Sequence, residues 1–241
     1  MGQQDRYRPR QRGFGLGHLV LAMILIAGAL WNGLIPLRYV PFAALNLNEP
    51  NSWFVDLRLA ALKFDVAQCK VALKDPIIDA HAIPDAPHEK GCGWRNAVSF
   101  SHAGGAHVGI DHMTCETAAA FAMWMAHEVQ PAAAEVFGAH VTSVHNLGTY
   151  SCRNILGSKA LKMFRSQHAR ANAIDVSAFV LSDGRTISVA KSWKSDSTES
   201  KFLHRIHDRA CHYFRVTLGP DYNAAHSNHF HLDRGAFRTC R

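Results

Sequence analysis

Apolar residues run almost without interruption from Phe14 to Leu37, where only one histidine and one asparagine are polar. At about 1.5 Å per residue, a helix over this stretch is long enough to cross a bilayer with some tilt. The sequence therefore predicts a transmembrane anchor over residues 14–37. A signal peptide cleaved at the small residues Ala27-Gly-Ala29 is the alternative, because such residues mark cleavage sites.

The segments on either side of this apolar run give it a direction. Residues 1–13 form a basic tail that carries four arginines, and positive charge on one flank holds that flank in the cytoplasm. The rest of the chain should then lie outside the cytoplasm, in a periplasm-like space. Residues 38–52 contain Pro41 and Pro50 and are predicted to be a linker.

Beyond the linker, the apolar pattern first predicts helices. A short helical stretch is expected over residues 53–75, and loops with short strands, one of them at 97–100, should follow it. The clearest helix spans residues 115–137, which are rich in alanine and methionine. Thr114 is its candidate N-cap and Gly138 its stop, and Pro131 should kink or split it.

The remaining pattern alternates mainly as strands do. Strands are predicted over 140–147 and 230–232, a hairpin over 174–181 and 185–189, and an amphipathic helix over 197–218. This order is typical of an α+β domain, here over residues 53–241, in which a small antiparallel sheet packs with helices.

Charge and cysteine content restrict the function. The net charge is +7, but the four arginines and Asp5 near the N-terminus contribute +3 of it, which leaves too little for a nucleic-acid partner. The six cysteines form no CxxC pair, so a cysteine zinc knuckle is not expected. They suit disulfides in an oxidising compartment, with buried free thiols as the alternative. Sequential pairing would join Cys69 to Cys92, Cys115 to Cys152 and Cys211 to Cys240.

Two separated segments carry the candidate chemistry. His168 and Asp175 come from one segment, and His226, His229 and His231 from the other. Side chains two apart on a strand share a face, so His229 and His231 can enter one site. Two imidazoles and one carboxylate are a ligand set that catalytic zinc uses. We therefore expect Zn²⁺ to be bound by His168, Asp175 and His231.

The other residues of these segments suit proton transfer. His229 lies beside the third ligand and is the candidate general base. His226 is expected to orient that base or to protonate the leaving amine. Asp233 continues the same face and is a candidate hydrogen-bond partner of a ligand.

The motif Ser166-x-His168-x-x-Ala171-x-Ala173-x-Asp175, followed by His229-x-His231, resembles that of the lysostaphin/D-Ala-D-Ala metallopeptidases. Within that group, the spacing of the last three histidines looks most like the penicillin-insensitive murein endopeptidases. From about Cys69 to Cys240, the chain resembles the bacterial extensin-like C-terminal family. Four blocks carry this resemblance: residues 150–154, 166–175, 218–223 and 229–233.

The resemblance implies the same zinc ligands, with His229 as the base. It also implies that Arg153 steadies either an oxyanion or a substrate carboxylate, as charge-assisted hydrogen bonds allow. Ala171 stands where relatives have glycine. If that position needs a positive φ, alanine is strained by about 1 kcal/mol, which would distort the turn or lower activity.

Together these observations predict a single-pass protein of the bacterial inner membrane whose C-terminal domain is a periplasmic zinc peptidase. Its expected substrate is the peptide part of peptidoglycan, cleaved as an endopeptidase or a carboxypeptidase. A catalytically weak, zinc-containing module that binds the wall or acts as an envelope scaffold is the first alternative. A disulfide-linked structural domain without metal is the second.

Overall fold

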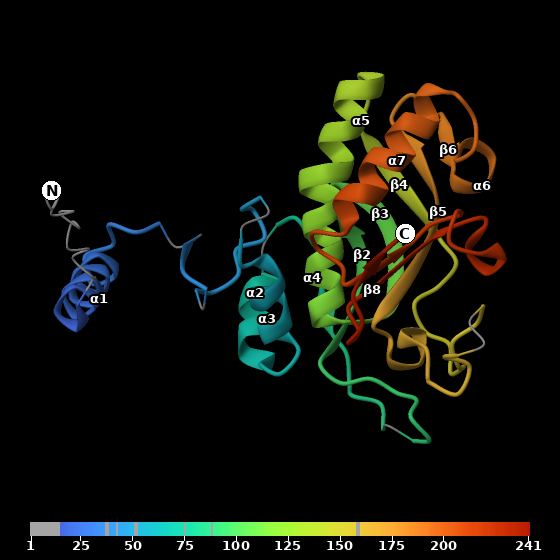
Figure 1. Cartoon of the computed structure of the whole chain (residues 1–241). Helices are drawn as coiled ribbons and strands as arrows, with labels where there is room; N and C mark the ends of the chain where they lie inside the picture. The colour runs from blue at the N-terminus through green and yellow to red at the C-terminus, as the bar shows by residue number, and fades with distance from the viewer. Residues whose placement is uncertain are drawn as a thin grey trace, which may run out of the picture.

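The first helix stands apart from the rest of the molecule. The computed structural model describes residues 15–36, 39–41, 43–50, 53–74, 76–87, 89–157 and 160–241. Helix α1 (Leu16–Trp31) buries none of its residues and lies to one side of the packed domain (Figure 1). The predicted basic tail, residues 1–13, lies outside the described residues.

The predicted transmembrane anchor is wrong. Helix α1 has 16 residues and ends at Trp31, before Gly33 at φ 66° and Pro36, although the apolar run continues to Leu37. At about 1.5 Å per residue it reaches roughly 24 Å, short of a hydrocarbon core of about 30 Å. Among the described residues, no helix combines the length and the apolar character that a membrane span needs. This finding also contradicts the predicted placement as a single-pass inner-membrane protein.

The domain is built on a large mixed sheet, which agrees with the predicted α+β class but not with the predicted kind of sheet. In the described chain its strands are β1 (His81–Ala82), β2 (Ala97–Ala103), β3 (Ala106–Thr114), β4 (Val141–Asn146), β5 (Ala173–Leu181), β6 (Thr186–Ser188), β7 (Val216–Leu218), β8 (Phe230–Asp233) and β9 (Thr239–Cys240). Their order is β1-β2-β3-β4-β5-β8-β7-β9, and β6 pairs with β5. The expected small antiparallel sheet is wrong, because β3–β4 and β7–β9 are parallel pairs.

Helices cover one face of this sheet (Figure 1). The helices of the domain are α2 (Val55–Leu62), α3 (Val66–Ala72), α4 (Cys115–Trp124), α5 (Gln130–Phe137), α6 (Val189–Ser192) and α7 (Thr198–Ala210). Every residue of α4 is buried, and the indole of Trp124 donates a hydrogen bond to the carbonyl of Ile206 on α7 (2.9 Å). The main core therefore lies between α4, α5, α7 and the sheet.

The helix predicted over 115–137 is interrupted, but upstream of the expected position. Met125–Val129 forms a π-helical segment, and Pro131 follows it directly in the first turn of α5. Gly138 ends α5 at φ 64°, as predicted.

Two other predicted helices are shorter than expected. The stretch 53–75 divides into α2 and α3, and the stretch 197–218 ends at Ala210 in α7. Residues 216–218 instead form β7, because they pair with both β8 and β9. These pairings are distant in sequence and therefore invisible to local periodicity.

All six cysteines form disulfides, but only one of the three predicted pairs is correct. The bonds join Cys69 to Cys115, Cys92 to Cys152 and Cys211 to Cys240. Sequential pairing fails because α3 packs on α4 and because the loop around Cys92 lies against the segment around Cys152.

Candidate metal centre

Strands β5 and β8 place two of the candidate ligands side by side. Ile174 and Val176 belong to the main core, so Asp175 between them lies on the opposite face of the sheet. Phe230 and Leu232 leave His231 on that face in the same way. Asp175 and His231 are direct register partners across the antiparallel pair β5–β8.

A tight turn brings in the third candidate. The 3-10 helix η3 (Gln167–Arg170) begins after Ser166, whose hydroxyl accepts a hydrogen bond from the N–H of His168 (3.3 Å). Ala171 ends it in the left-handed conformation at φ 50°, and its N–H donates to the carbonyl of His168. The positive φ considered for this alanine is thus present, with a strain of about 1 kcal/mol.

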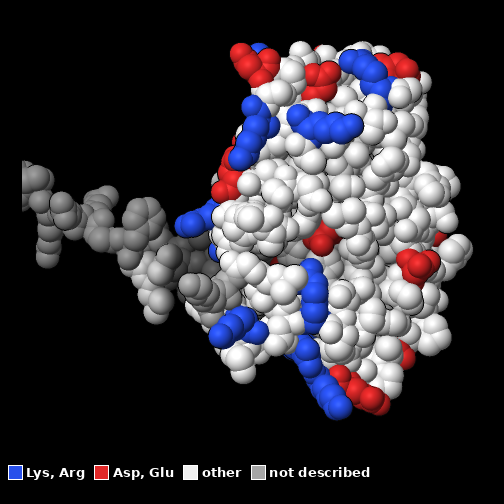
Figure 2. All heavy atoms as spheres, turned by 90° about the vertical axis from the view of Figure 1, so that its right-hand side faces the viewer, with Lys and Arg blue, Asp and Glu red and all other residues white. Residues whose placement is uncertain are grey.

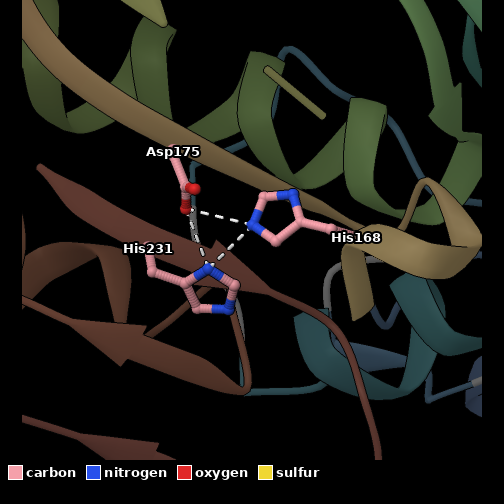
Figure 3. A group of neighbouring side chains, drawn as sticks. All are labelled: His168, Asp175 and His231. Carbon is pink, nitrogen blue, oxygen red and sulfur yellow. Dashed lines mark hydrogen bonds and ion pairs between the residues drawn. The ribbon is translucent and has the colours of Figure 1, made fainter. Parts of the chain in front are cut away.

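Three ligand atoms converge in this arrangement (Figure 3). The Nε2 of His168 lies 3.1 Å from the Oδ1 of Asp175 and 3.1 Å from the Nδ1 of His231. The Nδ1 of His231 lies 2.9 Å from the same Oδ1. Zinc held at about 2.0–2.2 Å with tetrahedral angles separates its ligand atoms by about 3.3 Å. The donor set and its spacing therefore fit zinc.

Hydrogen bonds on the far side of each imidazole select the ligand atom. The Nδ1–H of His168 donates to the carbonyl of Thr149 (3.2 Å), which leaves the Nε2 lone pair directed at the centre. The Nε2–H of His231 donates to the Oδ2 of Asp233 (3.0 Å), which leaves its Nδ1 free. Two lone pairs and a carboxylate thus face one another, an arrangement that requires a shared cation or proton.

The electrostatics of the metal-free centre point the same way. Burial raises the pKa of Asp175, but its interactions with the rings of His168 and His231 outweigh this effect and hold that pKa well below its usual range. Burial lowers the pKa of His231, but hydrogen bonds to Asp175 and Asp233 outweigh this and raise it to about 9. A positive charge is therefore stabilised between these side chains.

His229 and His226 lie next to the three ligands without joining them. The Nε2 of His229 is 3.6 Å from the Oδ1 of Asp175, and its Nδ1–H donates to the side-chain oxygen of Asn228 (2.8 Å). Burial lowers the pKa of His229, against the opposite effect of Asp175. The Nδ1 of His226 bonds the side-chain oxygen of Asn223 (2.8 Å), and burial with the charges of His231 and His229 lowers its pKa to about 4.

The centre opens into a cleft of about 430 Å³. Asp175, His226, His229 and His231 line it, and Arg153 lines it as well. The residues that form the rest of its walls include several large apolar side chains: Ile155, Leu156, Leu161, Met163, Phe164 and Phe237. Figure 2 shows the side of the molecule that lies on the right in Figure 1, where uncharged residues cover most of the surface and charged side chains of opposite sign adjoin one another at the upper and lower margins.

Sequence reasoning missed the groups that orient the imidazoles. Thr149 acts through its backbone carbonyl, which no side-chain pattern shows. Asn228 directly precedes His229 and Asn223 lies three residues before His226, so their spacing was the available signal. Asp233, in contrast, bonds a ligand as its place on the strand face indicates.

The sequence profile described as the extensin-like protein C-terminus matches residues 67–241, well over half of the chain. The chain belongs to this family. All of the candidate site residues lie within the matched part of this extensin-like chain. No curated protein and no solved structure matches it.

Proposed function

We propose that this extensin-like protein is a zinc-dependent peptidase that hydrolyses amide bonds in the peptide part of peptidoglycan. The convergence of three lone-pair-bearing atoms on one point, with both imidazoles fixed by hydrogen bonds of their own, is the observation that supports it. Three protein ligands leave the open position that catalytic zinc sites keep. Zinc bound there supplies a Lewis acid that polarises the amide carbonyl and acidifies water.

His229 is the residue best placed to move the proton. Asn228 holds its Nδ1–H, so the Nε2 lone pair is directed toward the ligands, 3.6 Å from the Oδ1 of Asp175. Because its pKa is lowered, the ring is neutral near neutral pH and accepts the proton of the attacking water. The protonated ring then returns that proton to the leaving amine.

His226 fits a positioning role better than a proton-donating one. With a pKa of about 4 its ring stays neutral at neutral pH, so it has no acidic proton to offer readily. Its ring centre lies 5.3 Å from that of His229 and 5.7 Å from that of His231. In this position it restricts the orientation of both rings.

Arg153 supplies positive charge on the wall of the cleft. Its guanidinium forms no ion pair with a described residue and donates a long hydrogen bond to the carbonyl of Asn154 (3.5 Å). Its guanidinium therefore retains donors for the oxyanion or for a substrate carboxylate.

Peptidoglycan as the substrate rests on the motif resemblance. The pattern from Ser166 to Asp175 and the pair His229-x-His231 resemble those of the lysostaphin/D-Ala-D-Ala metallopeptidases, which act on wall peptides. The cleft supports a peptide ligand, because apolar walls and separated polar groups suit a chain of amides with mixed side chains.

The test is digestion of purified muropeptides by the full chain, with and without a chelator and beside His231→Ala. The exposed His140, which has no role in the centre, provides the matched control His140→Ala. We expect cleavage by the wild type and by the control, and none with chelator or with His231→Ala. Equal cleavage in every arm would defeat the mechanism. Zinc binding and retention on the wall without turnover would indicate the scaffold module instead.

A further inference from the structure

A second cavity of about 210 Å³ adjoins the metal cleft. Gln167 and Arg170, at the two ends of the turn that carries His168, line both spaces. Lys63 and Arg95 complete the cationic part of its lining. A ligand that extends from the metal centre past this turn therefore reaches a space with three basic side chains.

These basic side chains have no partner of opposite charge in the described part of the chain. Lys63, Arg95 and Arg170 are exposed, and none forms an ion pair with a described residue. Glu116 also lines the cavity, but it is only 1% exposed and accepts a hydrogen bond from the buried guanidinium of Arg234 (2.8 Å). Its charge is thereby compensated, and three basic side chains face this one acidic side chain in the lining of the cavity.

Basic side chains without an ion-pair partner also line the metal cleft, outside the metal centre itself. Arg153 and Arg165 line it, and neither forms an ion pair with a described residue; Arg165 bonds the backbone of Lys90 and the amide of Asn154. The carboxylates of the cleft, Asp175 and Asp233, are bound to the histidines. Unneutralised cations therefore continue from the metal cleft into the second cavity.

Hydrogen bonds hold the segments that carry the three cations in place before any ligand binds. Asn96, next to Arg95, donates to the carbonyl of Leu62, next to Lys63 (2.7 Å). On the turn, the side chain of Asn172 donates to that of Gln167 (2.9 Å). Asn172 is itself held by the hydroxyls of Thr114 and Thr117 on the α4 side (both 2.7 Å). Binding therefore needs little ordering of the backbone, which favours affinity.

We propose that Lys63, Arg95 and Arg170 form a subsite for a carboxylate of the peptide substrate, remote from the amide that is cleaved. This proposal rests on the proposed function, since it concerns the same peptide. Arginine and lysine bind carboxylates by charge-assisted hydrogen bonds, and a cavity of this size holds one carboxylate-bearing side chain. The enzyme then selects peptides that carry a free carboxylate on the far side of the η3 turn.

The experiment compares labelled Ala-γ-D-Glu-Lys-D-Ala peptides in which the glutamyl or the C-terminal carboxylate is free or amidated. Binding to the full chain is measured by fluorescence anisotropy with chelator present, so that no turnover is needed. We expect one of the two amidations to weaken binding to the wild type about tenfold, the effect of one charge-assisted hydrogen bond. Arg95→Gln and Arg170→Gln should each reduce that preference to less than threefold.

Lys70→Gln is the matched control, because Lys70 is an exposed lysine on α3 that does not line the cavity. It should keep the full preference. Equal binding of free and amidated peptides by the wild type would overturn the subsite, and so would an unchanged preference in both arginine variants. Competition by inorganic phosphate without any carboxylate preference would show a non-specific anion site and also overturn it.

The peptidase proposal is judged separately by adding zinc. A carboxylate preference without cleavage by the zinc-loaded wild type would leave the subsite standing and refute the peptidase. Cleavage without a carboxylate preference would support the peptidase and refute the subsite.

Discussion

Replacing Asp233 by asparagine should weaken zinc binding although Asp233 does not contact the metal position. Its Oδ2 accepts the Nε2–H of His231 at 3.0 Å, and its Oδ1 accepts the N–H of Gly235 at 2.7 Å. Asparagine has the same size but only one acceptor oxygen, so one of these two donors must face an amide NH₂ group. If that donor is His231, its proton moves to Nδ1, the atom that binds the metal.

The size of the effect follows from this geometry. Partners that orient a metal-bound histidine contribute about 10–100-fold to metal affinity, which is about 1.4–2.7 kcal/mol. The bond to His231 is charge-assisted and Asp233 is 5% exposed, so solvent can replace it only poorly. We therefore expect the Kd for zinc to rise at least tenfold in Asp233→Asn.

Competition with a chromophoric chelator measures this Kd in the wild type and in the variant. Asp79→Asn is the matched control, because Asp79 also bonds a histidine (His102, 3.3 Å) but both side chains are exposed and far from the centre in the sheet. The control should bind zinc as the wild type does. A Kd for Asp233→Asn within twofold of the wild-type value would refute the reasoning.

Three further predictions concern stability. In metal-free protein the His231 pKa of about 9 exceeds its unfolded value of about 6.5. Its contribution to the free energy of unfolding is therefore complete below pH 6.5 and is lost as the pH rises through 9. The depressed pKa of Asp175 gives a contribution to the free energy of unfolding that is lost as the pH falls below about 4. Urea unfolding of chelated protein should show both losses, and a flat profile from pH 6.5 to 9.5 would contradict the first. Ala171→Gly should raise the free energy of unfolding by between zero and about 1 kcal/mol, since relief of the left-handed strain is partly offset by the entropy of glycine. If thermal unfolding shows that the variant is destabilised by more than about 1 kcal/mol, the strain argument is wrong. Replacing Cys92 and Cys152 together by serine should lower the free energy of unfolding by about 4 kcal/mol, because their bond closes a loop of 60 residues. A decrease of less than about 1 kcal/mol would mean that other contacts constrain the loop.

Local patterns in the sequence predicted the strands that carry the site. The alternation around Asp175 and the apolar neighbours of His231 correspond to β5 and β8, and the structure brings both side chains and His168 together. The prediction succeeded because each ligand is positioned by short-range geometry: a strand face for two of them and one tight turn for the third.

Features that depend on distant contacts were not predictable in this way. The parallel pairing of β3 with β4 and the pairing of β7 with β9 join segments whose proximity only the whole fold establishes. The disulfides of Cys69 and Cys92 follow the same rule, because spatial contact and not sequence order selects the partner.

The error at the N-terminus has a local cause. A hydropathy argument counts apolar residues, and the apolar run is nearly continuous from Phe14 to Leu37. Helix length depends on the backbone as well, and the segment with Gly33 and Pro36 lies beyond the helix end at Trp31.

The zinc content of the full chain tests the central claim most directly. Protein saturated with zinc and then separated from free metal by gel filtration should hold one zinc per chain, quantified by mass spectrometry, whereas the double variant His168→Ala/His231→Ala should hold none. A wild-type chain without zinc, or a double variant that retains a full equivalent, would contradict the account.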